Sequence, residues 1–348
     1  MKKLPCQKVH LLEVGKNMDY SKSNRNVMLN LLKGFACIGV VLIHITFPGK
    51  VGDLIKYASA YAVPIFFLIA GYFAFGKNVD TIKRRLIKII KIFIFAYLIF
   101  FLFNVLVQLK NHNLDVWLRD NYKITSLAKY VIFCTIGFAI PLWYLIAQIE
   151  TYIFWIITLK FKKENIVIKL IPVIFVLQVL LTAFCETMEY EWFWKINFVT
   201  RSLSWFALGY YIHSLPKEKI DRISNKKIIG TAIVGLVIAV LPIIIDSKLK
   251  FSVVGYIPYA TSIFLLAIKN GEKSLCKPLE YIGDKLSLWI YIFHVPTSSV
   301  VHMFVHKLLG IDTEIGLYPW IHPVITVCAV IVIAYVFNFM LEKLKKRQ

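Results

Sequence analysis

The chain has 348 residues, of which 58% are hydrophobic, and its mean hydropathy is +0.67. A soluble domain could not cover that much apolar side chain with polar surface, and the short alternating segments of a β-barrel are missing, so both classes are excluded. The net charge of +21, from 41 basic and 20 acidic residues, could indicate nucleic-acid binding. We attribute it instead to loop lysines that orient a membrane protein, and we expect no nucleic-acid partner.

Apolar runs of about 20 residues, the length that crosses a hydrocarbon core of about 30 Å, recur along the chain. They predict an all-α fold, a polytopic transmembrane helical bundle of about ten membrane-spanning helices. The helices are expected at residues 28–47, 57–75, 87–108, 141–159, 165–184, 197–213, 227–246, 251–269, 284–308 and 320–342. The apolar stretch 125–140 is expected to be re-entrant or interfacial, and counting it as spanning would give eleven helices.

Basic residues cluster in alternate connections between the predicted helices. The clusters lie in residues 1–26, 77–88, 160–163, 217–227, 269–285 and 343–348. Because cytoplasmic segments are enriched in Lys and Arg, ten helices with both termini in the cytoplasm satisfy this alternation, whereas eleven would place the last cluster outside. We therefore expect a basic cytoplasmic tail (1–26), one transmembrane domain (27–342) and a second basic tail (343–348).

Two ionisable residues, Lys33 and His44, lie eleven positions apart in the first predicted helix. Eleven steps of about 100° return to nearly the same face and climb roughly 16 Å. One stripe, which also includes Asn30 and Cys37, thus carries a cation near the inner membrane surface and a titratable ring near the outer one. Because ionisable groups are expensive in a bilayer, we interpret the pair as functional, although a snorkelling lysine and a packing histidine would also explain it.

Basic and aromatic side chains at the ends of the next helices each allow two interpretations. Arg84 and Arg85 precede the third predicted helix, where they could bind the phosphates of a coenzyme or of lipids. Trp143 and Tyr144 begin the fourth, where they could bind an acceptor molecule or belong to an interfacial aromatic belt.

Three further polar residues fall within predicted helices. Glu150 lies in the middle of its helix and requires a partner, for which His44 and Arg201 are candidates. Arg201 lies near the outer surface, where it could hold a sugar or pyrophosphate or simply snorkel. His294, close to Pro296, could bind a ligand or form a packing hydrogen bond.

Metal binding has little support in the sequence. His302 and His306 are spaced i, i+4, as zinc ligands on a helix often are, but no third ligand is evident. The six cysteines include no C-x-x-C pair, and several lie in apolar segments, so we interpret them as small buried hydrophobic residues. We expect no metal site.

Several segments match, in order and spacing, the motifs of a known family. They are Lys33-x10-His44, Pro64-Ile-Phe-Phe-Leu-Ile-Ala-Gly71-Tyr72, Lys83-Arg84-Arg85-Leu-Ile-Lys88, Leu142-Trp143-Tyr144-Leu145, Arg201-Ser-Leu-Ser-Trp-Phe-Ala-Leu-Gly209-Tyr210-Tyr211 and Leu286-Ser-Leu-Trp-Ile-Tyr291-Ile-Phe-His294. Through them the chain resembles the acyltransferase-3 family of membrane O-acyltransferases, over roughly residues 26 to 340. It departs from the family pattern at Lys33, where arginine is commoner, at Ala70, usually serine, and at Gln148, where one branch has glutamate.

The resemblance implies an enzyme that transfers an acyl group, commonly acetyl from cytoplasmic acetyl-CoA, to a hydroxyl of a cell-surface or lipid-linked glycan. Acetyl-CoA would be the donor substrate, and no permanently bound cofactor is expected. The implied partners are the lipid bilayer, an acyl-CoA and the glycan acceptor, and the implied location is the plasma membrane of a bacterium, as a multi-pass protein.

The resemblance also assigns roles to the candidate residues. The expected catalytic residues are His44, as general base or transient acyl carrier, and Glu150; the coenzyme-binding residues are Lys33, Arg84 and Arg85; the acceptor-binding residues are Trp143, Tyr144, Arg201 and His294. Two alternatives stay open. One is a transporter or flippase that moves a glycan, lipid or amino acid without making a bond, and the other is a membrane partner subunit without catalysis.

Overall fold

The computed structural model describes residues 26–247, 251–308, 310, 312–313 and 316–345. Within these residues every regular element is helical, which confirms the predicted all-α class. Nine helical stretches in this part of the chain are long and apolar enough to cross a membrane. The chain is therefore a multi-pass membrane protein.

The nine stretches follow the predicted order closely. They are Val27–His44 (α1), Gly49–Tyr72 (α2, Gly49–Ala58, a short turn, and α3, Ala62–Tyr72), Val79–Lys110 (α4), Ile140–Lys160 (a 3-10 turn and α7, Trp143–Lys160), Glu164–Thr187 (α8), Asn225–Ile244 (α11), Ser252–Lys269 (α12), Lys277–Lys307 (α13, Lys277–Tyr281, a π turn and most of α14, Ser287–Leu308) and Tyr318–Lys345 (α15). α4 begins eight residues before its predicted start because the Asn78 side chain accepts a hydrogen bond from Thr81 N and caps the helix there.

The remaining predicted helix, 197–213, is the sixth in chain order, and it is present but shorter than the nine stretches. It comprises a π turn, Val199–Leu203, that continues into α9, Ser204–Ser214. The Asn197 side chain accepts a hydrogen bond from Thr200 N at its start, and Pro216 follows its end, so local sequence limits the helix on both sides.

The uncertain stretch 125–140 contains no spanning helix. It contributes most of α6, Ile124–Ile132, which follows α5, Leu114–Tyr122. Each of these helices has nine residues, and at 1.5 Å per residue neither could cross the hydrocarbon core. Large apolar side chains on α6 are exposed, with Ile124 at 85% and Val131 at 70%, as expected for a helix at an interface.

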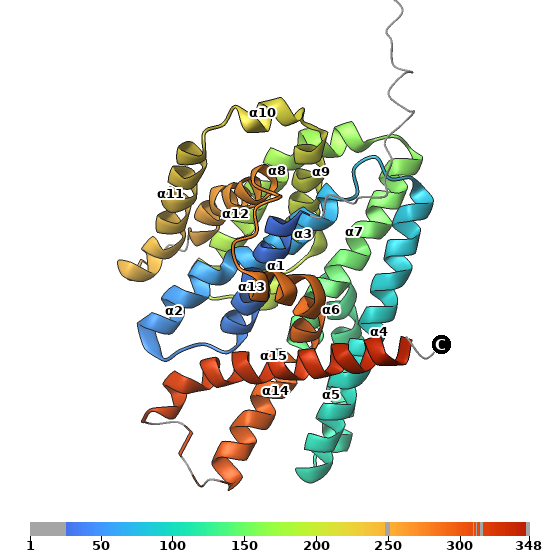
Figure 1. Cartoon of the computed structure of the whole chain (residues 1–348). Helices are drawn as coiled ribbons and strands as arrows, with labels where there is room; N and C mark the ends of the chain where they lie inside the picture. The colour runs from blue at the N-terminus through green and yellow to red at the C-terminus, as the bar shows by residue number, and fades with distance from the viewer. Residues whose placement is uncertain (1–25, 248–250, 309, 311, 314–315, 346–348) are drawn as a thin grey trace, which may run out of the picture.

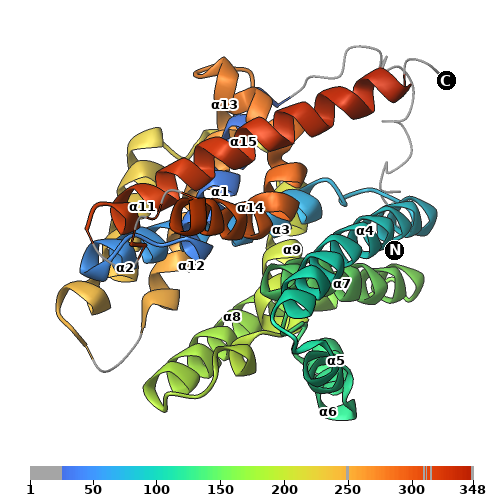
Figure 2. The same ribbon diagram turned by 90° about the horizontal axis from the view of Figure 1, so that it is seen from below.

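The helices pack as neighbouring pairs around α1 and α3. α4 lies beside α7, α11 beside α12, and α14 beside α15, which crosses the bundle in Figures 1 and 2. Three of the connections predicted to be cytoplasmic lie towards the upper end of Figure 1: the short helix α10 (Lys217–Asp221), the turn between α7 and α8, and the start of α4. α5 lies at the opposite end. Two other segments predicted to be cytoplasmic lie lower in this view, at α13 and at the end of α15.

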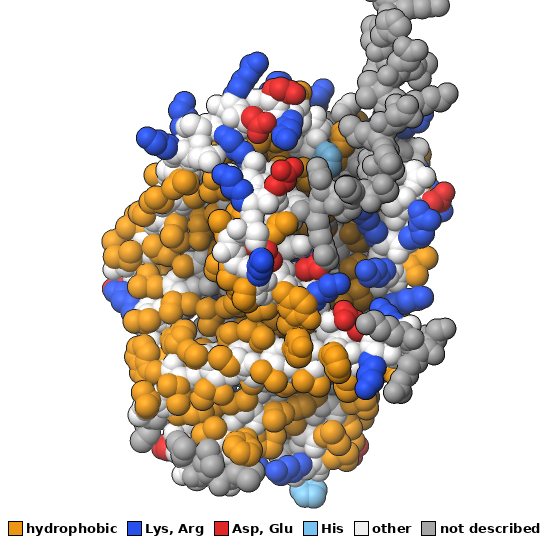
Figure 3. All heavy atoms as spheres, in the orientation of Figure 1, with side chains coloured by type: hydrophobic (Ala, Val, Ile, Leu, Met, Phe, Trp, Pro, Cys, Tyr) orange, Lys and Arg blue, Asp and Glu red, His pale blue; other side chains and the backbone are white. Residues whose placement is uncertain are grey.

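Basic and hydrophobic side chains occupy different parts of the surface. On the face shown in Figure 3, Lys and Arg side chains gather around α10 and along the right-hand side, near the start of α4 and the end of α15. Hydrophobic side chains cover most of the remaining face. Since an apolar surface of this extent is stable only in contact with lipid or another protein, the distribution agrees with a bundle embedded in a bilayer.

Two glycines allow α3 and α9 to approach closely. A Cβ added at Gly71 would lie 1.8 Å from the carbonyl oxygen of Phe206, and one at Gly209 would lie 2.1 Å from that of Leu68. Small residues at helix interfaces are a common way to obtain tight packing in membranes. The contact fixes the position of α3, which forms one wall of the cavity described next.

Candidate active site

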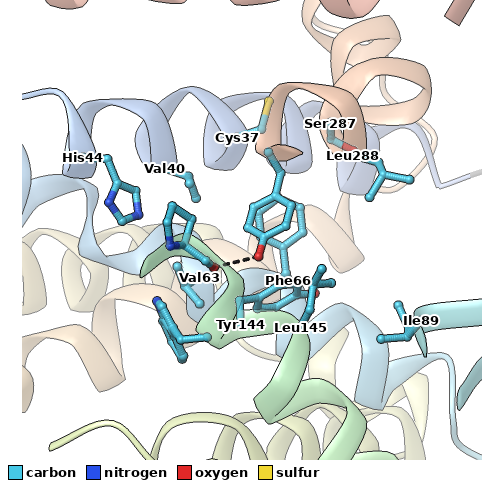
Figure 4. A pocket seen from close by; sticks show the side chains of 13 residues that line it. Cys37, Val40, His44, Val63, Phe66, Ile89, Tyr144, Leu145, Ser287 and Leu288 are labelled. Atoms are coloured by element: carbon cyan, nitrogen blue, oxygen red, sulfur yellow. Dashed lines mark hydrogen bonds between the residues drawn. The ribbon is translucent and has the colours of Figure 1, made fainter. Parts of the chain in front are cut away.

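A cavity of about 150 Å³ lies inside the bundle, between α1, α3, α4, α7 and α14. Figure 4 shows its lining residues distributed along α1, from His44 at one end past Cys37 towards Ser287, with Ile89 of α4 at the far end. Most of the lining is apolar or aromatic. His44 therefore faces an internal space that it shares with few other polar groups.

One face of α1 forms a long wall of this cavity. Cys37, Val40 and His44, at helical spacing, all line it. The Asn26 side chain caps the helix by accepting a hydrogen bond from Leu29 N at 2.9 Å. Lys33 lies one turn before Cys37 and is half-buried. The cavity thus extends from the histidine towards the end of α1 that carries the lysine.

The second histidine of the site is His294 on α14. Its ring centroid lies 5.1 Å from that of His44, and its side chain is completely buried. His294 Nδ1 lies 2.7 Å from the Tyr291 carbonyl oxygen, so Nδ1–H donates and Nε2 of the neutral ring carries a lone pair. That Nε2 atom has no hydrogen-bond partner among the described residues.

Aromatic side chains close the cavity opposite α1. The Tyr144 ring packs against Phe66, Phe67 and Tyr291, with centroids 4.7–6.1 Å apart. The Tyr291 hydroxyl donates a hydrogen bond to the Pro141 carbonyl oxygen at 2.7 Å, which Figure 4 marks. This bond joins α14 to the 3-10 turn Ile140–Leu142 at the start of α7.

Replacing Tyr291 with phenylalanine should lower stability without removing the cavity wall. The substitution keeps the ring but leaves the Pro141 carbonyl without its donor, a loss of about 1 kcal/mol of unfolding free energy. Thermal unfolding of the detergent-solubilised protein would measure it. Tyr335→Phe, at a half-exposed position on α15, is the control and should leave the melting temperature unchanged. Equal melting temperatures for both variants would show that the bond contributes nothing.

The structure brings four of the nine predicted site residues together. His44, Trp143 and Tyr144 line the cavity, and His294 packs against His44. Cys37, Ser287 and Tyr291 also line it but were not predicted as site residues. Tyr291 could have been found, because it precedes His294 by three residues and must share its helix face.

Glu150 and Arg201 lie among other partners. The Glu150 carboxylate accepts a hydrogen bond from the Cys134 thiol at 3.2 Å, which ties the loop before α7 to that helix. Arg201 donates from Nε to the Lys195 carbonyl oxygen at 3.1 Å and from Nη2 to the Thr182 hydroxyl at 3.2 Å. Neither residue lines the His44 cavity.

The two arginines before the third predicted helix lie inside the first turns of α4. Arg85 Nη2 donates to the Phe73 carbonyl oxygen at 2.9 Å, and Arg84 Nη2 donates to the Thr81 hydroxyl at 3.2 Å. Arg85 precedes Ile89 by one turn, and Ile89 lines the far end of the cavity. Among the described residues, no group of three or more His, Cys, Asp or Glu side chains is placed to hold a metal ion.

These observations define a class of protein: a multi-pass helical membrane protein with a histidine in an aromatic-walled cavity between its helices. Residues 26–339 match the acyltransferase-3 family, which is described as an acyltransferase domain. The chain belongs to this family, and it is a membrane acyltransferase. Searches among curated proteins and among solved structures each found no match.

Proposed function

We propose that the chain is an O-acyltransferase that moves an acetyl group from cytoplasmic acetyl-CoA to a hydroxyl of a cell-surface or lipid-linked glycan, in the plasma membrane of a bacterium. The observation that carries the proposal is the cavity along α1. It begins at His44 and extends towards the end of the helix that carries Lys33. A donor with a thioester at one end and phosphates at the other matches that arrangement.

His44 is the proposed general base. Its neutral imidazole takes the proton of the acceptor hydroxyl while that oxygen attacks the thioester carbonyl carbon. The carbon–sulfur bond then breaks, and the proton passes to the departing thiolate, so that an ester and free coenzyme A are formed. In a second route His44 attacks the thioester carbon itself, the carbon–sulfur bond breaks and coenzyme A leaves as the thiolate. The acceptor hydroxyl then takes the acyl group from the imidazole, and its proton ends on the thiolate. The His294 ring beside His44 supports its position in both routes.

Lys33, Arg84 and Arg85 are the proposed contacts of the coenzyme phosphates. Lys33 lies eleven residues, or about 16 Å, from His44 along α1. Arg85 is one turn from the far end of the cavity on α4. Charge-assisted bonds from such groups to phosphate are among the stronger hydrogen bonds in proteins. Trp143 and Tyr144, which line the cavity, are the proposed acceptor contacts near the reacting centre.

Changing the charge at Lys33 should affect donor binding. We expect Lys33→Glu to raise the KM for acetyl-CoA about tenfold or more, because a carboxylate would repel the phosphates, whereas Lys33→Arg should stay within about threefold. Lys226→Glu, an exposed position in another predicted cytoplasmic connection, makes the same charge change away from the cavity and serves as control. Equal KM values in all variants would reject a phosphate contact at Lys33.

The proposed function can be tested by determining the side of the membrane on which acetyl-CoA must be supplied for acyl transfer. Labelled acetyl-CoA is supplied to sealed inverted vesicles and to intact cells that produce the protein. We expect alkali-labile label on glycan from the inverted vesicles only. Glycan or lipid that changes sides without gaining label would instead identify a carrier.

A further inference from the structure

A second cavity, of about 230 Å³, lies on the predicted outer side of the bundle. Two connections form it: the segment with α5 and α6, between α4 and α7, and the 3-10 turn Trp192–Lys195 between α8 and α9. Its polar lining side chains are Asn121, Ser126, Lys129, Tyr130, Thr135 and Glu191. This lining contrasts with the apolar and aromatic lining of the His44 cavity, so the two spaces suit different ligands.

The hydroxyl groups of this outer cavity can only accept hydrogen bonds from a ligand. Each hydroxyl hydrogen is already donated to a backbone carbonyl: Ser126 Oγ to Asp120 O (2.7 Å), Tyr130 Oη to Asn121 O (2.6 Å) and Thr135 Oγ1 to Phe133 O (2.7 Å). Burial raises the pKa of Tyr130 to about 12, so its phenol stays protonated and keeps donating at neutral pH. The free lone pairs favour a ligand with many hydroxyl donors.

Two charged side chains of opposite sign, Lys129 and Glu191, line the outer cavity. The Lys129 ammonium lies over the Phe193 ring, 4.2 Å from its centroid, which holds the lysine side chain in place. The Glu191 carboxylate supplies further acceptor oxygens. Since these two charges balance, the cavity is suited to an uncharged polyhydroxyl molecule, which can both accept from the ammonium and donate to the carboxylate.

The 3-10 turn Ile140–Leu142 contributes residues to both the outer cavity and the His44 cavity. Ile140 lines the outer cavity, while Pro141 and Trp143 line the His44 cavity. The Tyr291–Pro141 hydrogen bond holds this turn against α14. A sugar residue in the outer cavity would therefore lie next to the end of the site where the hydroxyl must react.

We infer that the outer cavity binds an uncharged sugar residue of the glycan acceptor and presents a hydroxyl to the His44 cavity. The inference rests on the proposed function, since it supplies the acceptor of that same reaction. It gives the paired helices α5 and α6, with the loop after them, a role in acceptor recognition. Glu150, through its bond to Cys134, then acts as a positioning residue for that loop.

The test compares acceptor kinetics of Glu191→Gln and Lys129→Gln with those of the wild-type protein in lipid nanodiscs. Two acceptor preparations serve as probes: the aqueous polysaccharide fraction and the solvent-extracted glycolipid fraction, both from cells that lack this chain. Each variant should raise the acceptor KM about tenfold, the loss expected for one charged hydrogen bond, and leave the KM for acetyl-CoA unchanged. The fraction that shows this rise identifies the source of the sugar.

Glu189→Gln is the matched control, because Glu189 is exposed in the same connection and does not line the cavity. Acetyl-CoA binding by each sample verifies that the variant has folded. Wild-type acceptor KM values for both cavity variants would overturn the inference while leaving the proposed function intact. Transfer that persists after His44→Ala would instead count against the proposed function.

Discussion

Replacement of His44 with alanine should reduce acyl transfer by about 10²–10⁴-fold, the usual contribution of a positioned general base. The ring faces the cavity, and the described residues place one other histidine, His294, beside it. His294 is completely buried and does not line the cavity, so the base role is assigned to His44. Initial rates of ester formation from labelled acetyl-CoA, with donor and acceptor both saturating, would measure the effect.

The control for this variant is His306→Ala, which removes an exposed histidine on α14 and should keep the wild-type rate. The double variant His44→Ala/His294→Ala should be no slower than His44→Ala alone if the two rings act in one step. Wild-type turnover by His44→Ala would eliminate both routes proposed for this residue and would favour a role without bond formation.

Substitution of Gly71 with alanine should strongly impair folding. The new Cβ would lie 1.8 Å from the Phe206 carbonyl oxygen, so α3 and α9 would have to separate. Overpacking of this kind typically costs about 1–3 kcal/mol or more, and backbone cannot yield as a side chain can. We expect a lower melting temperature in detergent and a reduced yield of folded protein. Because α3 also carries Val63 and Phe66, acyl transfer should fall as well.

Gly230→Ala provides the matched control on α11, where an added Cβ meets no atom within 4 Å. Alanine favours helix over glycine by about 0.5–1 kcal/mol, so this variant should be as stable as the wild-type protein or more stable. Identical melting curves for Gly71→Ala and Gly230→Ala would show that the close approach of α3 and α9 is not required.

Most of the fold was predictable from the apolar runs because a bilayer demands helices of a fixed length. The predictions failed at helix ends, where side-chain caps decide. Asn78 starts α4 well before its apolar run, whereas the helix predicted at 197–213 is observed at 199–214, between Asn197 and Pro216. Composition alone does not decide whether residues 125–140 cross the membrane. In the structure this stretch contains most of α6, which is too short to cross the hydrocarbon core.

The candidate site was only partly predictable. The stripe from Lys33 to His44 follows from helical spacing alone, and Cys37, Val40 and His44 do line one cavity. Spacing within one helix gave no reason to place Glu150 beside Cys134, or Arg201 beside Thr182, because each contact joins a helix to a different segment of the chain. The role of each of these residues in the reaction stays a prediction.

The sequence by itself determined the class of the protein, since its apolar runs, its alternating basic clusters and its ordered motifs each reflect local chemistry. Only the tertiary structure decided which polar groups meet. The pairing of His44 with His294, and the cavity between their helices, depend on how α1 and α14 pack. This packing depends on the shapes of side chains throughout the bundle, so it cannot be inferred from a local sequence pattern.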